Sequence, residues 1–126
     1  MLSNSRFYIF KIRYKEQYWL DILSANELAG LIANTLKDGL PELQFKNLQF
    51  INVYENDLFN CELHINKLKY KNKRIIAKED SGKLCRKLAG QLSKINQFSY
   101  KEIQLVNDEF SKQPSIGFLK EDLFYV

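Results

Sequence analysis

Apolar residues recur at two different spacings along this chain, and the order of these spacings constrains the fold. Every second residue is apolar over residues 10–14 and 59–65, which is the period of a strand with one buried face. Spacings of three and four appear over residues 28–36 and 84–95, which is the period of a helix with one buried stripe. Further β-rich segments complete the order β-β-α-β-β-β-α-β. This order predicts an α+β fold in which an antiparallel or mixed sheet carries both helices on one face.

A hairpin is predicted at the start of the chain. Arg6–Tyr14 and Tyr18–Leu23 flank a short polar break and are interpreted as its two arms. Trp19 is expected in the core, with strand addition by a partner at this edge as the alternative. The remaining strands are expected at residues 48–54 and 59–65, over 68–77 with a break at 71–73, and around Ile103 and Leu105. A turn is expected at 55–57 and a turn or bulge at 66–67.

Each predicted helix has a start signal and an apolar stripe. Ser24 and Glu27 form the Ser-x-x-Glu pattern of a capping box, and Gly39 is expected to be a left-handed residue after the last turn. Residues 79–82 lead into the second helix, in which Gly90 is expected to mark a close packing contact. The stripes consist of Leu28, Leu31, Ile32, Thr35 and Leu36 in the first helix and Leu84, Leu88, Leu92 and Ile95 in the second.

The length of 126 residues fits one domain, expected over residues 1–126. Only five glycines and two prolines occur, which argues against long linkers. A ferredoxin-like arrangement is one option for the sheet, and no internal repeat is apparent. Pro114 and Gly117 mark a loop, and the apolar residues at 118–119 and 123–126 are expected to pack on the body or on a partner.

Charge is sorted along the chain. Residues 61–101 hold eleven Lys and Arg residues against three Asp and Glu residues, a net charge of +8. The flanking residues 1–60 and 102–126 have net charges of −1 and −3, so an overall charge of +4 hides a concentrated basic block. Such a block is typical of a surface that contacts an anionic partner.

The basic block is expected to form two adjacent rows. Lysines at every second residue of an extended segment lie on one face, about 7 Å apart, and the second helix adds basic residues on its polar side. Tyr70 and Tyr100 are candidate stacking faces beside them. The candidate anion-binding residues are Lys67, Lys69, Lys71, Lys73, Arg74, Lys83, Arg86, Lys87 and Lys94.

Other interpretations of the same charge stay open. Lysines on a solvated edge strand discourage edge-to-edge pairing. The acidic residues 102–126 are able to neutralise the block within the chain or between two subunits. The lysines outnumber the arginines fifteen to four, which counts against base-specific contacts, since these favour arginine.

No catalytic or metal-binding signature is found. Cys85 and His64 are the one conceivable thiol–imidazole pair, but free cysteines are mostly small buried hydrophobic residues. One His and two Cys give no metal-ligand spacing, and Ser81-Gly82-Lys83 lacks the first Gly and the final Ser/Thr of a phosphate loop. We therefore expect no catalytic residues, no metal and no cofactor.

The leading hypothesis is a small, non-enzymatic interaction module that binds a protein partner or associates with itself. The alternative is a nucleic-acid-binding protein that uses Lys67–Arg74 and the polar face of the second helix, and a third is an enzyme whose site has no local motif. No apolar run approaches the roughly 18 residues of a membrane span, and no signal peptide is recognised. A cytoplasmic protein without a membrane partner is expected.

Overall fold

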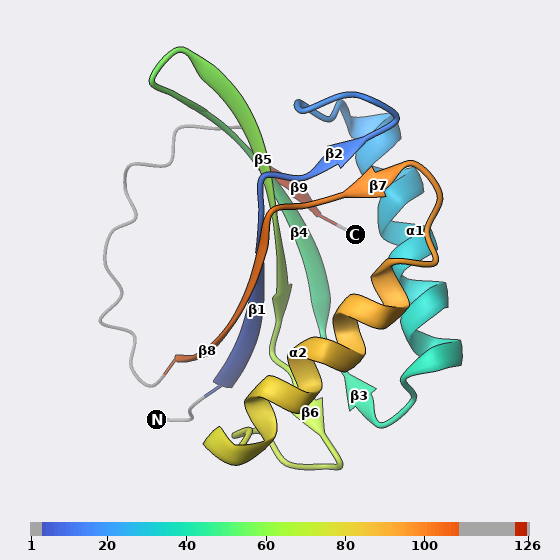
Figure 1. Ribbon diagram of the computed structural model, residues 1–126, viewed down its shortest axis with the longest axis vertical. Coiled ribbons are helices and arrows are strands. Elements are labelled where there is room, and N and C mark those ends of the chain that lie inside the picture. The colour runs from blue at the N-terminus through green and yellow to red at the C-terminus, as the bar shows by residue number, and fades with distance from the viewer. Residues whose placement is uncertain (1–3, 109–122, 126) are drawn as a thin grey trace.

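The computed structural model describes residues 4–108 and 123–125 of the chain and has an α+β fold (Figure 1). Helices α1 (Ile22–Gly39) and α2 (Lys78–Leu92) both cover one face of an antiparallel sheet, as predicted. The order of the sheet is β8-β1-β5-β4-β9. Its strands are β1 (Asn4–Phe10), β4 (Asn47–Glu55), β5 (Leu58–Asn66), β8 (Glu102–Asp108) and β9 (Leu123–Tyr125).

Two short antiparallel pairs lie beside this sheet. β2 (Arg13–Tyr14) pairs with β7 (Phe98–Ser99), and β3 (Leu43–Gln44) pairs with β6 (Lys69–Tyr70). In Figure 1 the β3–β6 pair lies at the lower end of the molecule, and the hairpin that joins β4 to β5 rises at the upper end. These two ends carry the surfaces described below.

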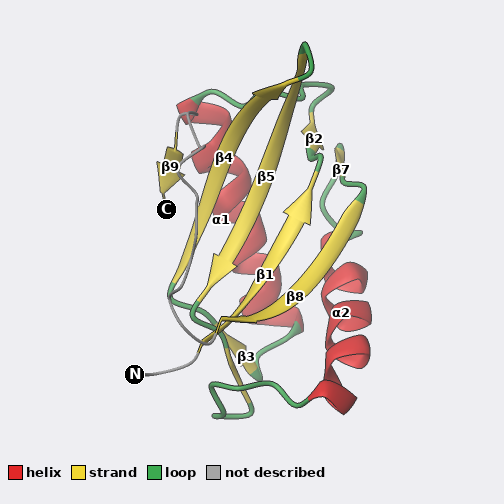
Figure 2. Cartoon of the chain, turned by 90° about the vertical axis from the view of Figure 1, so that its left-hand side faces the viewer, coloured by secondary structure: helices red, strands yellow, loops and turns green. Residues whose placement is uncertain are grey.

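The four long strands and two helices form a ferredoxin-like βαββαβ unit. β8, β1, β5 and β4 lie side by side with both helices behind them (Figure 2). The unit contains two β-α-β halves, β1-α1-β4 and β5-α2-β8. The first strand of each half lies between the two strands of the other, so neither half has a complete sheet alone.

The two halves repeat in backbone detail. Lys11 and Lys67 are both left-handed residues that follow the first long strand of their half. The turns Lys15-Glu16 and Lys71-Asn72 are both left-handed throughout, and each is closed by a bridge, Tyr14 to Gln17 and Tyr70 to Lys73. This repeat is not apparent in the sequence, because only five of eighteen residues are identical between 4–21 and 60–77.

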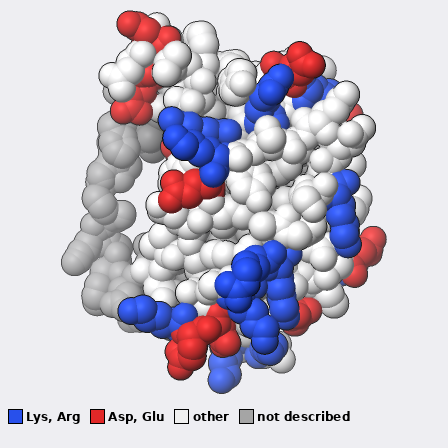
Figure 3. All heavy atoms as spheres, viewed as in Figure 1, with Lys and Arg blue, Asp and Glu red and all other residues white. Residues whose placement is uncertain are grey.

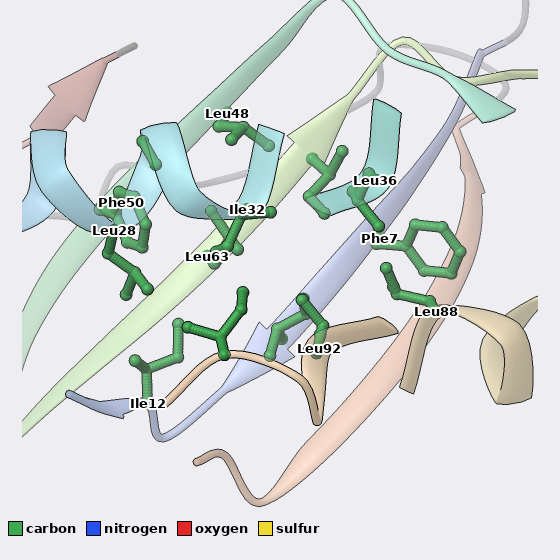
Figure 4. Close-up of a cluster of buried hydrophobic side chains, with 14 of the residues drawn as sticks. Phe7, Ile12, Leu28, Ile32, Leu36, Leu48, Phe50, Leu63, Leu88 and Leu92 are labelled. Carbon is green, nitrogen blue, oxygen red and sulfur yellow. The ribbon is translucent and has the colours of Figure 1, made fainter. Parts of the chain in front are cut away.

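The core lies between the sheet and the helices. Figure 4 shows apolar side chains from α1, α2, β1, β4 and β5 meeting there. Of the five α1 stripe residues, three are buried, Thr35 is half-buried and Leu31 is 41% exposed, whereas the α2 stripe is buried throughout. The buried residues of the two predicted stripes are Leu28, Ile32, Leu36, Leu84, Leu88, Leu92 and Ile95.

The predicted strand at Tyr18–Leu23 is wrong, because α1 begins within it. Asp21 is the N-cap residue, and its Oδ1 accepts a hydrogen bond from the Ser24 amide at 2.7 Å. A carboxylate is a strong acceptor at a helix N-terminus. The helix therefore starts one turn before the predicted capping box at Ser24, and Glu27 contacts Tyr14 and Lys15 instead.

Both glycine predictions are also wrong. Gly39 does not have a positive φ; it lies in the last turn of α1, and the C-cap is Leu40. A Cβ on Gly39 would lie 1.8 Å from Oε1 of Gln91, so this glycine, not Gly90, marks the close approach of the helices. A Cβ on Gly90 would have no atom of another part of the described chain within 4 Å.

The last strand is confirmed around Ile103 and Leu105 as β8. At the C-terminus, β9 pairs with β4, with Leu123 opposite Ile51. The predicted loop at Pro114 and Gly117 and the apolar residues at 118–119 lie outside the described residues.

Gly90→Ala should raise the free energy of unfolding by about 0.5–1 kcal/mol, because alanine has the higher helix propensity and its methyl group enters open space. Urea denaturation of the variant and the wild type measures the change. A loss of stability would mean that a close contact does exist at this position.

Candidate binding surfaces

The predicted row of lysines does not share one face. Lys67 and Lys69 are exposed and alternate with buried Leu68 and Tyr70, as expected for an extended segment. Lys71 and the following residue then form a left-handed turn. The chain reverses there and Lys73 pairs back with Tyr70. The predicted break at 71–73 is thus a tight turn after the short strand β6, and it takes Lys71 and Lys73 out of the row.

Three of the predicted basic residues meet around one hollow at the lower end of the molecule. Lys67, Lys69 and Arg74 line it together with Lys46, and its volume is about 430 Å³. We call it the β3–β6 hollow; its full lining is Asn4, Gln44, Phe45, Lys46, Lys67, Leu68, Lys69 and Arg74.

Lys46 was missed in the sequence, because it lies outside the basic block and precedes the first lysine of that block, Lys67, by 21 residues. The pairing of β3 with β6 places it there: Gln44 lies opposite Lys69, and the Lys46 amide donates to the Asn66 carbonyl at 3.0 Å. The apolar-then-polar pattern around β3 is too short to signal a strand, so no local signal identified this residue.

On the other side of β6, positive charge is neutralised within the chain. Nζ of Lys87 lies 3.2 Å from Oε2 of Glu42 and donates to the Tyr70 hydroxyl at 3.3 Å. A backbone hydrogen bond and then the one from Lys87 lower the pKa of Glu42, and the Glu42 contact raises the pKa of Lys87. Lys71 and Lys87 both lie beside the Tyr70 ring, at 5.3 and 5.9 Å from its centroid.

The structure buries one of the two predicted stacking faces and leaves the other partly exposed. Tyr70 is only 4% exposed and packs in the core. Tyr100 is half-buried and lies against Phe98, with the ring centroids 5.8 Å apart. The Tyr70 ring is therefore not available to a base.

The basic residues of α2 are separated from the hollow's lining. Lys83, Arg86 and Lys94 are exposed, and Nζ of Lys94 donates to Gln91 at 3.1 Å. The first turn of the same helix carries Glu79 and Asp80. Figure 3 shows blue side chains gathered at the lower end of the molecule with red ones among them. The basic block is thus divided into the hollow, the Lys87 ion pair and scattered helix residues.

The thiol–imidazole pair is not formed, because the sheet separates its members. Cys85 lies on α2 and packs against the core. His64 points to the opposite face of β5, where it lies 3.1 Å from Glu62 and 4.5 Å from the Tyr8 ring. Burial raises the pKa of the Cys85 thiol, and burial followed by the charge of Glu62 raises that of Cys61 to about 12.

A second surface lies at the upper end of the molecule. Five large side chains are between 36% and 61% exposed there. Trp19 and Tyr54 both pack on the Phe59 ring, with centroid distances of 4.9 and 4.8 Å. A hollow of about 450 Å³ adjoins them. We call this surface the aromatic end patch; it consists of Tyr18, Trp19, Tyr54, Leu58 and Phe59.

Two devices hold the patch together. A two-residue turn at Asn56 and Asp57, both left-handed, joins β4 to β5 and suits the twist of a hairpin. Asn52 is fully buried in β4; its Nδ2 donates to the Leu20 carbonyl at 2.8 Å, and its Oδ1 accepts from the Leu20 amide at 3.2 Å. Trp19 is therefore held beside the hairpin, at 36% exposure, rather than in the core where it was expected.

Asn52→Ala should lower the free energy of unfolding by about 2–4 kcal/mol, because both polar groups of the buried Leu20 backbone lose their partner. Chemical denaturation followed by the fluorescence of Trp19, the single tryptophan, measures this. A change below about 1 kcal/mol would mean that the clamp is replaced by other contacts.

Both thiols should react with Ellman's reagent at pH 7.5 more slowly than a model thiol. The raised pKa values leave less thiolate at this pH than in the unfolded chain. The rate should rise in urea, where both thiols are exposed. A native Cys85 that reacts as fast as the model thiol contradicts this assignment.

In the described part of the chain, no three His, Cys, Asp or Glu side chains come together as a metal site. No helix in that part is long and apolar enough to cross a membrane. No protein-family model, curated protein or solved structure matches this chain.

Proposed function

We propose that the protein is a non-enzymatic interaction module that binds a protein partner through the aromatic end patch. The observation that carries this proposal is the exposure of five large apolar side chains on two adjacent segments. Contiguous exposed apolar patches are typical of interaction sites. Tyr and Trp are also the residues on which binding energy concentrates in protein interfaces.

The acidic tip of the hairpin favours a basic partner. Glu55 and Asp57 are both exposed there. Glu16 is also exposed, but it lies 4.0 Å from Arg13, whose guanidinium lies over the Tyr18 ring. The partner we propose therefore presents apolar side chains flanked by Lys or Arg.

A symmetric dimer fits this surface less well. A two-fold interface brings the same patch of both subunits together. The acidic tip at Asp57 would then face its own copy, and like charges across an interface are unfavourable. We accordingly propose a different protein as the partner and a cytoplasmic location, in keeping with two unpaired cysteines.

Nucleic-acid binding is a second candidate function. The clustering of Lys46, Lys67, Lys69 and Arg74 around the β3–β6 hollow favours it. The basic residues of α2 support it less, because Lys87 already has Glu42 as its partner.

Selection from a randomised peptide display library tests the protein-binding proposal. Selected peptides should carry aromatic or aliphatic residues beside Lys or Arg. Phe59→Thr should weaken the best peptide at least about tenfold, which is a loss of about 1.4 kcal/mol. Threonine suits a strand, and Phe59 is 53% exposed, so the variant should remain folded.

Ile75→Thr is the matched control, since Ile75 is similarly exposed (46%) but lies outside the patch. It should bind the peptide like the wild type. The proposal is wrong if no peptide is enriched or if both variants lose affinity equally. A dimer seen by light scattering at tens of micromolar that Phe59→Thr dissociates would instead assign the patch to a second copy.

A further inference from the structure

Each half of the fold carries a basic surface at one of the two short strand pairs. We call these surfaces the β3–β6 corner and the β2–β7 corner. The short strands pair in the same way at each corner, with Gln44 opposite Lys69 and Ser99 opposite Arg13. The amides of Lys46 and Lys101 donate to the carbonyls of Asn66 and Phe10, at 3.0 and 2.9 Å. The equivalent pairs, first at the β3–β6 corner and then at the β2–β7 corner, are Lys67 and Lys11, Lys69 and Arg13, Lys46 and Lys101, Phe45 and Tyr100, and Arg74 and Tyr18.

Among these five pairs, one changes the charge of the corner. Tyr18 replaces Arg74 at the β2–β7 corner, and the Arg13 guanidinium lies over its ring, 5.5 Å from the centroid. Arg13 also lies 4.0 Å from Glu16. The guanidinium at this corner is thus occupied within the chain.

At the β3–β6 corner the cations surround an open hollow. Among the described residues that line it, four are Lys or Arg and none is Asp or Glu. Four like charges around one space repel one another unless an anion enters it. Lysines elsewhere in the described chain do have acidic partners: Lys87 contacts Glu42, and Lys15 contacts Glu27.

We propose that the β3–β6 hollow binds a nucleotide unit of single-stranded nucleic acid. The ammonium groups of Lys46, Lys67 and Lys69 suit phosphate oxygens as point charges, and the guanidinium of Arg74 is able to bind two of them at once. Phe45 supplies an apolar wall for the base. The volume of about 430 Å³ matches a ligand of this size.

A nucleic-acid strand is favoured over a free nucleotide by the charge that lies next to the hollow. Lys73 is exposed and directly precedes Arg74 of the lining, so it adds a positive charge next to the hollow, whereas Lys71 lies beside the Tyr70 ring on the other side of β6. A polymer is able to use the charge of Lys73 as well as those of the lining, whereas a mononucleotide is not. The hollow and the aromatic end patch lie at opposite ends of the molecule (Figure 1), so this site stands or falls independently of the protein-binding function.

Fluorescence anisotropy with labelled eight-nucleotide dT and rA strands, at 50 to 200 mM salt, tests the site. Lys67→Gln with Lys69→Gln should weaken binding about tenfold or more at low salt. Each lost phosphate contact should also reduce the slope of log K against log salt by about 0.7. AMP and inorganic phosphate serve as competitors.

Lys11→Gln with Arg13→Gln is the control, because it removes two charges at the equivalent backbone positions of the other corner. It should bind the strands nearly as the wild type does. Thermal melts establish that both variants are folded.

If AMP displaces the labelled strand at a concentration comparable to that of the unlabelled strand, the hollow binds a free nucleotide and the proposal of a nucleic-acid strand is wrong. Equal weakening of both variants, or no binding at 50 mM salt, overturns the site altogether.

Discussion

The pairing of β1 with β5 is the contact on which the rest of the structure depends. Phe7 lies opposite Ile65, Tyr8 opposite His64 and Ile9 opposite Leu63. Each of these strands opens one β-α-β half, so their pairing interleaves the halves and brings α1 and α2 onto one face. The buried apolar side chains of that face then contribute roughly 25 cal/mol per Å² removed from water. The hydrophobic core is therefore shared between the halves.

Much of this fold was predictable from residue spacing. The strands at 48–54 and 59–65 and both helices follow from periods that reflect one buried face. Local signals failed where a contact from elsewhere decides the conformation. Tyr18–Leu23 has the composition of a strand, but Asp21 initiates a helix within this segment. The Asn52 side chain also holds the backbone just before that helix.

The candidate sites were less predictable, because a surface is assembled across the sequence. Lys67, Lys69 and Arg74 were found from their spacing, whereas Lys46 reaches them through the β3–β6 pairing alone. Lys87 pairs with Glu42, which precedes the basic block in the sequence; most of the acidic residues of 102–126 lie outside the described residues. Net charge per segment located the basic region but not the partners of its members.

The left-handed turns have a consequence for how this chain can vary. Lys15, Glu16 and Lys71 adopt a backbone that disfavours L-residues by roughly 1–2 kcal/mol each, and glycine would relieve that cost. Glycine would also delete a charged side chain at each corner. Selection for stability alone should therefore push these positions toward glycine, while selection for surface charge retains the strain. The two corners of the fold are places where these two pressures oppose each other directly.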